Sequence, residues 1–475
     1  MPHLIDSGRG KILIHESYRY HRNKTRLDRI YWRCGLTHCR ASLTTNNFDN
    51  GQNIPINVLR VAEHDHIPEI GRIHHQQHVN GMRERIRADP TLPARRVYEQ
   101  ELVQRGRNPQ PREVGDRFPR FEAIRGALGR TRAQVVPPIP QTVAQVLIPQ
   151  EWSTTFNGEN FVRHQNNNRG ILIVATDGDI RLMGRCNTLF MDGTFKTAPH
   201  PYTQMFTVHG MLNNYVFRFT CSLLINKAQE SYQYVIQQIK IAYRNLTGND
   251  LNPNAVVIDF EAALKQAIVL ELPNSIIYGC FFHFCKAIWR HVQQEGLQQP
   301  YQNDQQIHTI IRSIMALAFV PINFVRLSYQ NLRQDPVTLQ KIVQYPGLAA
   351  LVLYFENQWL RADGVFPPNT WNVHERPMEF RTNNHVESFH NRWNQLVGVN
   401  HPSLWTFITR AKEDQTNHEQ RVAEMWNGDP PPLRRLKWRR LEERVVRLRH
   451  QLNNGQRNIN EYWDAIKHVI IDFAI

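Results

Sequence analysis

Short apolar runs rich in β-branched residues alternate with longer stretches in which apolar positions recur every three or four residues. The short runs predict buried strands, and the longer pattern predicts amphipathic helices. Two helices are predicted among the strands in the middle of the chain, Glu230–Asn245 and Glu261–Leu270. The strands predicted there are Gly170–Thr176, Leu189–Met191, Tyr202–Met211, Tyr215–Leu224, Ala255–Ile258 and Ser275–Cys280. This order predicts an α/β domain.

The pattern after this domain is purely helical. An all-α segment is predicted from four helices: Gln306–Phe319, Ile322–Asp335, Val337–Gln344 and Leu348–Arg361. A further helix, Thr382–Asn394, follows, with Asn383 or Asn384 as its N-cap. Lys412–Asp429 is also predicted to be helical.

The last strongly patterned stretch, residues 433–452, predicts a basic helix. One helical stripe is apolar and consists of Leu441, Val445, Leu448 and Leu452. Arginine occupies the other faces, including Arg434, Arg435, Arg439 and Arg440. This pattern fits a helix that contacts a DNA backbone and equally fits an oligomerisation helix with a basic rim.

The N-terminal residues predict a small β-rich module with a metal site. Its β-type runs are Lys11–His15, Ser17–His21 and Leu27–Arg33. Cys34 and Cys39 follow, and His64 and His66 come later; two thiolates and two imidazoles suit tetrahedral zinc. The alternative is that these residues gather by chance in a His-rich region, and His38 could compete as a ligand. The YWRC run, the second Cys and the terminal His-x-His resemble a FLYWCH-type zinc finger, which implies a structural Zn²⁺.

The charge of the chain indicates a polyanionic partner. The formal net charge is +15 across 475 residues. No apolar run approaches the roughly 18–20 residues that a membrane span needs, so nucleic acid is the favoured partner and a membrane is not. Six cysteines in a chain of this length do not make a disulfide framework, which favours a reducing compartment.

An Arg-rich region between residues 70 and 133 is one candidate DNA contact. Its predicted helices are Ile70–Arg87, Ala94–Arg105 and Pro119–Arg132. Guanidinium groups bind phosphate well, so Arg125, Arg130 and Arg132 are candidate DNA-binding residues. A helix-turn-helix-like unit and a merely solvated charged face are both compatible with the pattern.

Three acids recur in a related setting. Asp192 directly follows the apolar run Leu189–Met191, and Asp259 directly follows the apolar run Ala255–Ile258. Glu387 lies in the first part of the helix that is predicted from Thr382. Three carboxylates are the minimum set of side chains that can hold two divalent cations. Hard cations such as Mg²⁺ prefer oxygen ligands, which carboxylates supply. We interpret Glu261 as helix N-terminal charge, and Asp177 and Asp179 as turn formers.

The motifs MDGTF, VIDFEAAL, CFFH and RTNNHVESFHN, in this order, resemble those of the Mutator-like element (MULE) transposases. The resemblance covers roughly residues 118–411 and implies an RNase H-like fold with an Asp-Asp-Glu triad. Carried over to this chain, the catalytic residues and ligands of two Mg²⁺ or Mn²⁺ ions are Asp192, Asp259 and Glu387. His283, in the Cys-x-x-His element, is expected near the scissile phosphate, although a second zinc site or core packing also fits it. Trp359 is either a core residue or a platform for an extruded base.

These inferences predict a DNA transposase that binds terminal inverted repeats, cleaves DNA and joins 3′ ends to target DNA. The alternative is a domesticated, sequence-specific DNA-binding regulator without transposition activity. Double-stranded DNA is the expected partner, with at least a dimer of the chain on it, and the nucleus is the expected location. The predicted division is 1–69, finger; 70–150, Arg-rich helices and linker; 151–296, first part of the catalytic domain; 297–375, all-α insertion; 376–412, last catalytic helix; 413–475, basic helical region.

Overall fold

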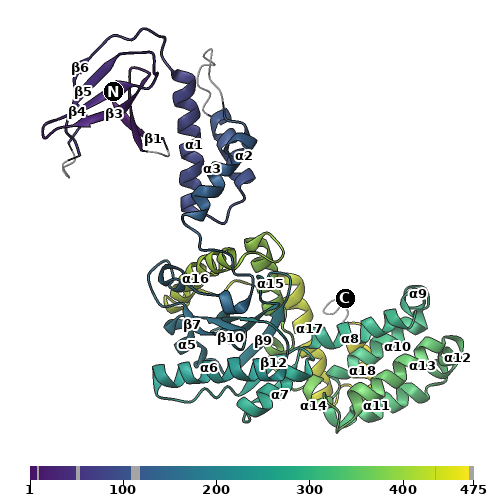
Figure 1. Cartoon of the computed structure of the whole chain (residues 1–475). Coiled ribbons are helices and arrows are strands. Elements are labelled where there is room, and N and C mark those ends of the chain that lie inside the picture. The colour runs from purple at the N-terminus through teal and green to yellow at the C-terminus, as the bar shows by residue number, and fades with distance from the viewer. Residues whose placement is uncertain (8–9, 50–53, 108–117, 434, 470–475) are drawn as a thin grey trace. The chain divides into compact units, whose positions relative to one another are not determined.

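A computed structural model describes residues 1–7, 10–49, 54–107, 118–433 and 435–469 (Figure 1). The chain divides into two compact units, Met1–Ile139 and Pro140–Ile475. Among the described residues, no helix combines the length and the apolar character that crossing a membrane requires.

The first unit begins with a six-stranded antiparallel sheet in the order β1-β2-β3-β4-β5-β6. Apolar residues from alternate positions form its small core: Leu13, Tyr20, Ile30, Trp32 and Leu43. The strands are β1 (His3–Asp6), β2 (Lys11–His15), β3 (Tyr18–Thr25), β4 (Arg29–Cys34), β5 (Ser42–Asn46) and β6 (Val58–Val61). The predicted β-rich module is thus confirmed.

Three helices complete this unit: α1 (Ile70–Ala88), α2 (Ala94–Arg107) and α3 (Phe121–Ala133). Helix α1 packs on the sheet, because Ile73 contacts Ile12 and Ile14. A partly buried ion pair reinforces the junction, with Nη2 of Arg19 2.8 Å from Oε1 of Glu69. The three helices share a core of Val79, Met82, Ile86, Val97, Ile124 and Leu128.

The second unit contains a seven-stranded mixed sheet in the order β13-β12-β9-β10-β11-β8-β7. Strands β9, β10 and β11 form an antiparallel meander, and β12 and β13 add to its β9 edge in parallel. The strands are β7 (Val162–Asn166), β8 (Ile171–Val174), β9 (Thr188–Thr194), β10 (Gln204–Leu212), β11 (Tyr215–Leu224), β12 (Ala255–Ile258) and β13 (Ile276–Gly279).

Helices cover both faces of this sheet. Helices α6 (Gln229–Thr247) and α7 (Ala262–Glu271) lie on one face, and α15 (Asn384–Val397) and α16 (Leu404–Trp426) lie on the other (Figure 1). Shorter elements before and within the sheet are η1 (Val143–Gln145), α4 (Gln150–Ser153) and α5 (Asp177–Met183). Helix α5 corrects one prediction: Asp177 and Asp179 lie in a helix rather than a turn, with Thr176 and Asp179 forming its capping box.

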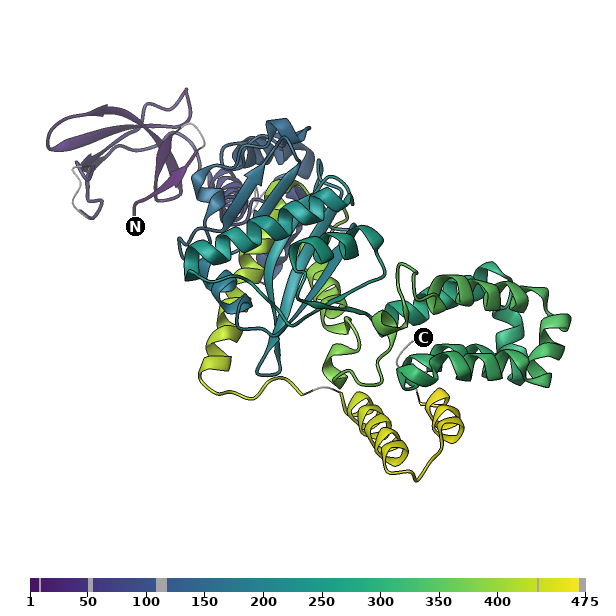
Figure 2. The same cartoon turned by 90° about the horizontal axis from the view of Figure 1, so that it is seen from below.

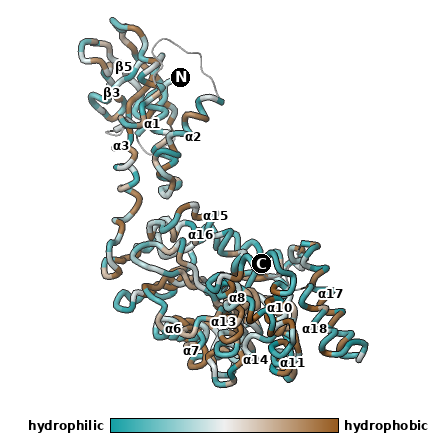
Figure 3. The backbone as a smooth tube through the Cα atoms, turned by 90° about the vertical axis from the view of Figure 1, so that its right-hand side faces the viewer, coloured by the Kyte–Doolittle hydropathy of each residue, from teal (hydrophilic) through white to brown (hydrophobic). Residues whose placement is uncertain are grey.

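Between β13 and α15 the described chain forms helices and no strands. These are α8 (Phe281–Gln294), α9 (Gln298–Asn303), α10 (Gln305–Ala316), η2 (Leu317–Phe319), α11 (Ile322–Gln334), α12 (Pro336–Gln344), α13 (Pro346–Phe355), η3 (Glu356–Leu360), α14 (Pro368–Trp371) and η4 (Met378–Phe380). Hydrophobic stretches are frequent around α8, α10 and α13, where Figure 3 colours the backbone brown. Helices α8, α10, α13 and α14 contribute to one apolar core, which includes Phe284, Ile311, Phe355 and Trp371.

The C-terminal helices α17 (Leu436–Asn453) and α18 (Ile459–Lys467) pack against this helical region (Figure 2). Val445 and Leu448 are buried in its core, and Leu441 and Leu452 pack partly against it. The apolar stripe of α17 is therefore covered within the same chain. Because these side chains pack within the chain, the stripe is not an exposed surface for oligomerisation in this structure.

Candidate functional site

The two aspartates follow from strand alternation. In β9, Leu189 and Met191 enter the core beneath α6 and α7, while Phe190 packs with Val386 of α15 on the other face. Side chains alternate between the faces of a strand, so Asp192 belongs to the α15 face. In β12, Val257 shares the cluster of Phe190.

Strand register brings the second aspartate to the first. Strands β9 and β12 are parallel, with Val257 paired to Phe190. Two residues further along each strand are Asp259 and Asp192, at the same edge of the sheet and on the same face. Parallel strands lie about 4.8 Å apart, so the sequence motifs MDGTF and VIDFEAAL place two carboxylates side by side.

Glu387 arrives from α15, whose residue Val386 packs against Phe190 and Val257. Asn383 occupies the N-cap position, as predicted, but its side chain makes no capping hydrogen bond. Asn383 is fully buried, and the described residues offer no partner to its amide group. The helix therefore sets Glu387 in its first turn without the predicted side-chain cap.

The acids act on one another electrostatically. Burial, followed by the charge of Asp259, raises the pKa of Asp192 to about 7, and Glu387 contributes in the same direction. Burial also raises the pKa of Asp259. Like charges held together in a low-dielectric site disfavour ionisation, and a bound cation would relieve this. The donor set consists of carboxylate oxygens, which fits a hard divalent ion.

His283 lies beside the acids. Its Nε2 is 3.3 Å from Oε1 of Glu387. Burial alone would lower the pKa of His283, but its contacts with Cys280 and Glu387 raise it to about 11. The hydrogen bond from His283 in turn lowers the pKa of Glu387. The imidazolium therefore partly neutralises the acid cluster.

Two further neighbours were missed at the sequence level. His390 Nδ1 is 3.7 Å from Oδ2 of Asp192, and burial lowers the pKa of His390 to about 4, so it is neutral there. The ammonium of Lys227 lies 4.1 Å from the ring centroid of Phe195, just after the MDGT motif, and its charge lowers the pKa of Asp259 against the larger effect of burial. Lys227 lies in the connection between β11 and α6, where no motif marks it.

The carboxylate of Glu261 contacts other side chains than the carboxylates of Asp192, Asp259 and Glu387 do. It accepts a hydrogen bond of 2.8 Å from the hydroxyl of Tyr232, and its other oxygen is 3.7 Å from Nζ of Lys227. Burial raises the pKa of Glu261. Glu261 is the N-cap residue of α7, without a side-chain capping bond.

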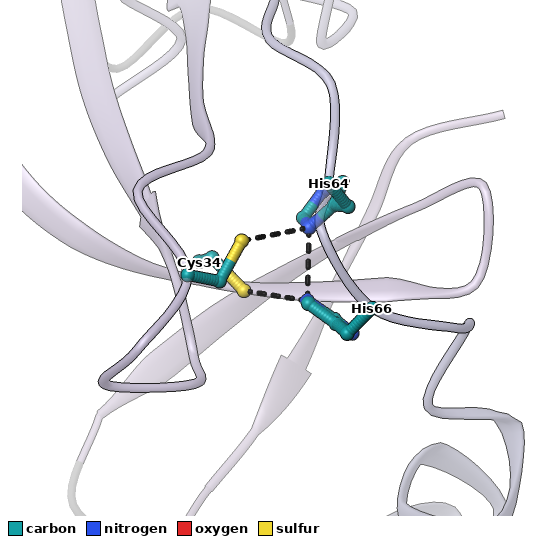
Figure 4. A group of neighbouring side chains, drawn as sticks. Cys34, His64 and His66 are labelled. Carbon is teal, nitrogen blue, oxygen red and sulfur yellow. Dashed lines mark hydrogen bonds between the residues drawn. The ribbon is translucent and has the colours of Figure 1, made fainter.

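The four predicted zinc ligands meet in the finger. Figure 4 labels three of them, Cys34, His64 and His66. Sγ of Cys34 is 3.2 Å from Nε2 of His66, Sγ of Cys39 is 3.5 Å from Nδ1 of His64, and the two imidazole nitrogens are 3.0 Å apart. Zn–S and Zn–N bonds of about 2.3 and 2.0–2.1 Å give tetrahedral edges of about 3.3–3.6 Å, close to this spacing. The donors fit Zn²⁺.

Outer contacts orient both imidazoles. Nε2 of His64 lies 2.7 Å from the hydroxyl of Tyr20, and Nδ1 of His66 donates to the carbonyl of Ile67 at 2.8 Å. Such contacts leave the other ring nitrogen available to a metal. His38 lies near His66, with ring centroids 6.1 Å apart, and is outside the four-residue cluster.

The two sites differ in compactness. In the part of the chain that the structure describes, the finger cluster is the one group of ligand atoms that all lie within 4.8 Å of one another. The acids of the second unit do not gather as closely, and Glu387 is instead paired with His283.

The other predicted contact residues fall into three groups. Arg125, Arg130, Arg435, Arg439 and Arg440 are exposed, whereas Arg434 lies outside the described residues. Arg132 is half-buried and donates to the carbonyl of Leu92, so it holds α3 against the loop before α2. Trp359 is 2 % exposed and packs edge-on against Phe260 and Phe284. The core alternative therefore describes Trp359 in this structure.

Comparison with protein families gives two matches. A model described as the MULE transposase domain matches residues 188–287, which include Asp192, Asp259 and His283 but end before Glu387. A model described as the FLYWCH zinc finger domain matches residues 4–66, which include all four candidate zinc ligands. A comparison with curated proteins gives no match. The chain thus combines an N-terminal FLYWCH zinc finger domain with a MULE transposase domain.

Proposed function

We propose that this chain is a DNA transposase of the Asp-Asp-Glu type, which binds terminal inverted repeats, cleaves DNA and joins 3′ ends to target DNA. The observation that carries the proposal is the position of three acids on one face of the sheet: Asp192 in β9, Asp259 directly after β12, and Glu387 in the first turn of α15. Burial, the charge of Asp259 and the charge of Glu387 all raise the pKa of Asp192. The MULE transposase domain supports a transposase-related function.

The fold supports the same reading. An antiparallel meander is extended by two parallel strands, with helices on both faces, and the two aspartates end neighbouring strands. We propose that this is an RNase H-like domain, that α8–α14 form an all-α insertion, and that α15 returns to supply Glu387.

Asp192, Asp259 and Glu387 would hold two Mg²⁺ or Mn²⁺ ions. Bound there, the ions supply activation of the attacking hydroxyl and charge relief at the leaving oxygen. One oxygen of Glu387, Oε1, is paired with His283, which leaves Oε2 available to an ion. His283 would face the negatively charged phosphate beside the ions, and Lys227 adds a second cation near Asp259.

The finger would contribute DNA recognition through a structural Zn²⁺. The exposed arginines of α3 and α17 would add sequence-independent phosphate contacts. We propose a nuclear location and at least a dimer on DNA. All six cysteines are free, which is compatible with a reducing compartment.

The test is Mg²⁺-dependent nicking of DNA that carries the repeats flanking the coding element. Cleavage at the repeat ends supports the transposase. Specific binding without cleavage, under conditions where both Mg²⁺ and Mn²⁺ are supplied, would instead support a DNA-binding regulator.

A further inference from the structure

A pocket of about 180 Å³ lies at the N-terminal end of α15, next to the acid cluster but separate from it. Its walls are partly aromatic and partly polar, and include Phe281, Phe319, Trp438, Arg381, Asn384 and Ser388. Ser388 directly follows Glu387 on α15, so one helix serves both sites.

Arg381 is one of the residues that line this pocket, and its side chain is buried. The residue is 4 % exposed, and Nε, Nη1 and Nη2 find no hydrogen-bond partner among the residues that the structure describes. Its cationic group does lie over the ring of Phe319, with Cζ 4.9 Å from the centroid. A guanidinium carries five N–H donors, and burying it without acceptors is strongly unfavourable. Its main chain is held in place, because the carbonyl of Arg381 accepts a bond of 2.9 Å from the amide of Phe281.

Two more arginines lie around Arg381, and two acids, Glu379 and Glu442, line the pocket without forming an ion pair with Arg381 among the described residues. Arg376 donates to the carbonyls of Gly279 and Thr370, and Arg449 donates to the carbonyl of His374. Among the described residues, no ion pair joins Arg376, Arg381 or Arg449 to a carboxylate. Burial, followed by the charge of Arg449, lowers the pKa of Arg381 to about 10.

The end of α15 is a second, independent feature that favours an anion. This helix has 14 residues, and its N-cap Asn383 makes no side-chain capping bond. Exposed amide groups and the helix dipole make such an end attractive to negative charge. Asn384 and Ser388 both line the pocket, so its polar donors come from the same end.

We propose that this pocket binds a phosphate group of the DNA backbone, through Arg381 and the first turn of α15, beside the phosphate that the acid cluster would process. The choice of DNA as the source rests on the proposed function; the anion site does not. Bidentate Arg–phosphate pairing would supply the missing acceptors. The aromatic wall suits the sugar that accompanies a backbone phosphate. Glu442 of α17 also lines the pocket, and its charge opposes an anion.

The first experiment asks whether the anion site exists and requires no DNA. The full chain is titrated with inorganic phosphate against chloride at equal ionic strength, and the thermal midpoint is followed. Phosphate should raise the midpoint of the wild type, and Arg381→Gln should weaken phosphate binding about tenfold or more. Arg290→Gln, which removes an exposed arginine from α8, is the matched control and should bind phosphate as the wild type does.

Glu442→Gln covers the case in which Arg381→Gln does not fold. Removing a like charge from the pocket should tighten phosphate binding about three- to tenfold. Equal phosphate binding by wild type, Arg381→Gln and Arg290→Gln, or weaker binding by Glu442→Gln, would overturn the site. An adventitious, non-specific effect of phosphate would leave all variants alike and would also overturn it.

The second experiment identifies the source of the phosphate. Duplex DNA binding is measured as a function of salt, and the slope of log K against log salt should be shallower by about 0.9 in Arg381→Gln, which is one phosphate. An unchanged slope, with inorganic phosphate binding lost, would overturn DNA as the source and assign a free phosphate or nucleotide. Phosphate binding that depends on Arg381 in a protein that never cleaves DNA would refute the proposed function and leave this site standing.

Discussion

The buried carboxylates of the second unit are of two kinds, those beside other acids and those beside cationic side chains. Asp192 faces other acids, and burial together with Asp259 raises its pKa to about 7. Asp414 faces two arginines, with Nε of Arg218 2.9 Å and Nη2 of Arg392 2.6 Å away. The first arrangement is unfavourable until a cation arrives, whereas in the second the charges compensate one another, and removing one partner would destabilise the fold.

Asp179 belongs to the second kind and predicts a pH dependence. Its Oδ1 is 2.8 Å from Nε2 of His418. Burial alone would raise the pKa of Asp179, but the charges of His418 and Arg218 hold it below its ordinary value. A lowered pKa stabilises the fold above the unfolded value of about 4, and the contribution is lost as pH falls below it. In urea unfolding, Asp179→Asn should therefore be less stable than wild type at pH 7, with the gap narrowing below pH about 4. A constant gap would refute this role.

At the scale of elements, apolar runs predicted the strands that carry Asp192 and Asp259, because buried parallel strands are apolar throughout. The Thr-Asp-Gly-Asp turn was predicted wrongly, since local signals for a turn and a capping box overlap. The apolar stripe of α17 predicted that one face of this helix is covered. It did not predict which segment covers that face, because periodicity carries no information on the partner. Arg381 and Lys227 gave no sequence signal at all, because their importance arises from what surrounds them after folding.

The coverage of α17 gives a second prediction. Leu448 is 7 % exposed in the helical core, whereas Val446, two positions earlier, is 43 % exposed. Leu448→Asp should lower the free energy of unfolding by about 3–5 kcal/mol, because it buries an unpaired charge. Val446→Asp should change it by at most about 0.5 kcal/mol. Chemical denaturation compares the two; equal losses, or a change of oligomeric state with Leu448→Asp alone and no loss of stability, would contradict the packing.

The finger gives a third prediction. Helix α1 packs on the sheet through Ile73, so residues 1–139 form the appropriate fragment. Structural zinc contributes about 10–16 kcal/mol of folding free energy in finger peptides, so a strong chelator or Cys34→Ser should unfold the sheet. His38→Ala should retain zinc and fold, since His38 is outside the ligand cluster. Circular dichroism and metal content after dialysis are the measurements, and a folded, metal-free Cys34→Ser fragment would refute the site.

At the scale of the whole molecule, the motifs identified the two domains, and composition indicated a polyanionic partner. Charge cannot be assigned to a surface from composition, because arginines in this chain serve several purposes. Arg132 binds a backbone carbonyl, Arg218 pairs with a buried acid, and Arg439 and Arg440 face solvent. Only the last kind is available to DNA phosphates.

A fourth prediction follows for those exposed arginines. Replacing Arg435, Arg439 and Arg440 with Gln should weaken DNA binding and reduce the slope of log K against log salt by up to about 0.9 for each phosphate lost. The control replaces Arg244, Arg333 and Arg361, each exposed but paired with its own carboxylate. The control has the same net charge, so an equal effect on the slope would show that only overall charge acts and would remove α17 from the interface.

The central claim is that Asp192, Asp259 and Glu387 form one metal-dependent active site. The direct measurement is strand nicking of repeat-bearing DNA in Mg²⁺ by Asp192→Asn, Asp259→Asn, Glu387→Gln and the control Glu261→Gln, whose carboxylate is bound to Tyr232. Each triad variant should lose at least about 100-fold in cleavage rate while still binding DNA, the losses should not add, and Glu261→Gln should retain most activity. Cleavage that survives in Glu387→Gln but not in Glu261→Gln, or that is equal in all four variants and the wild type, would contradict the account.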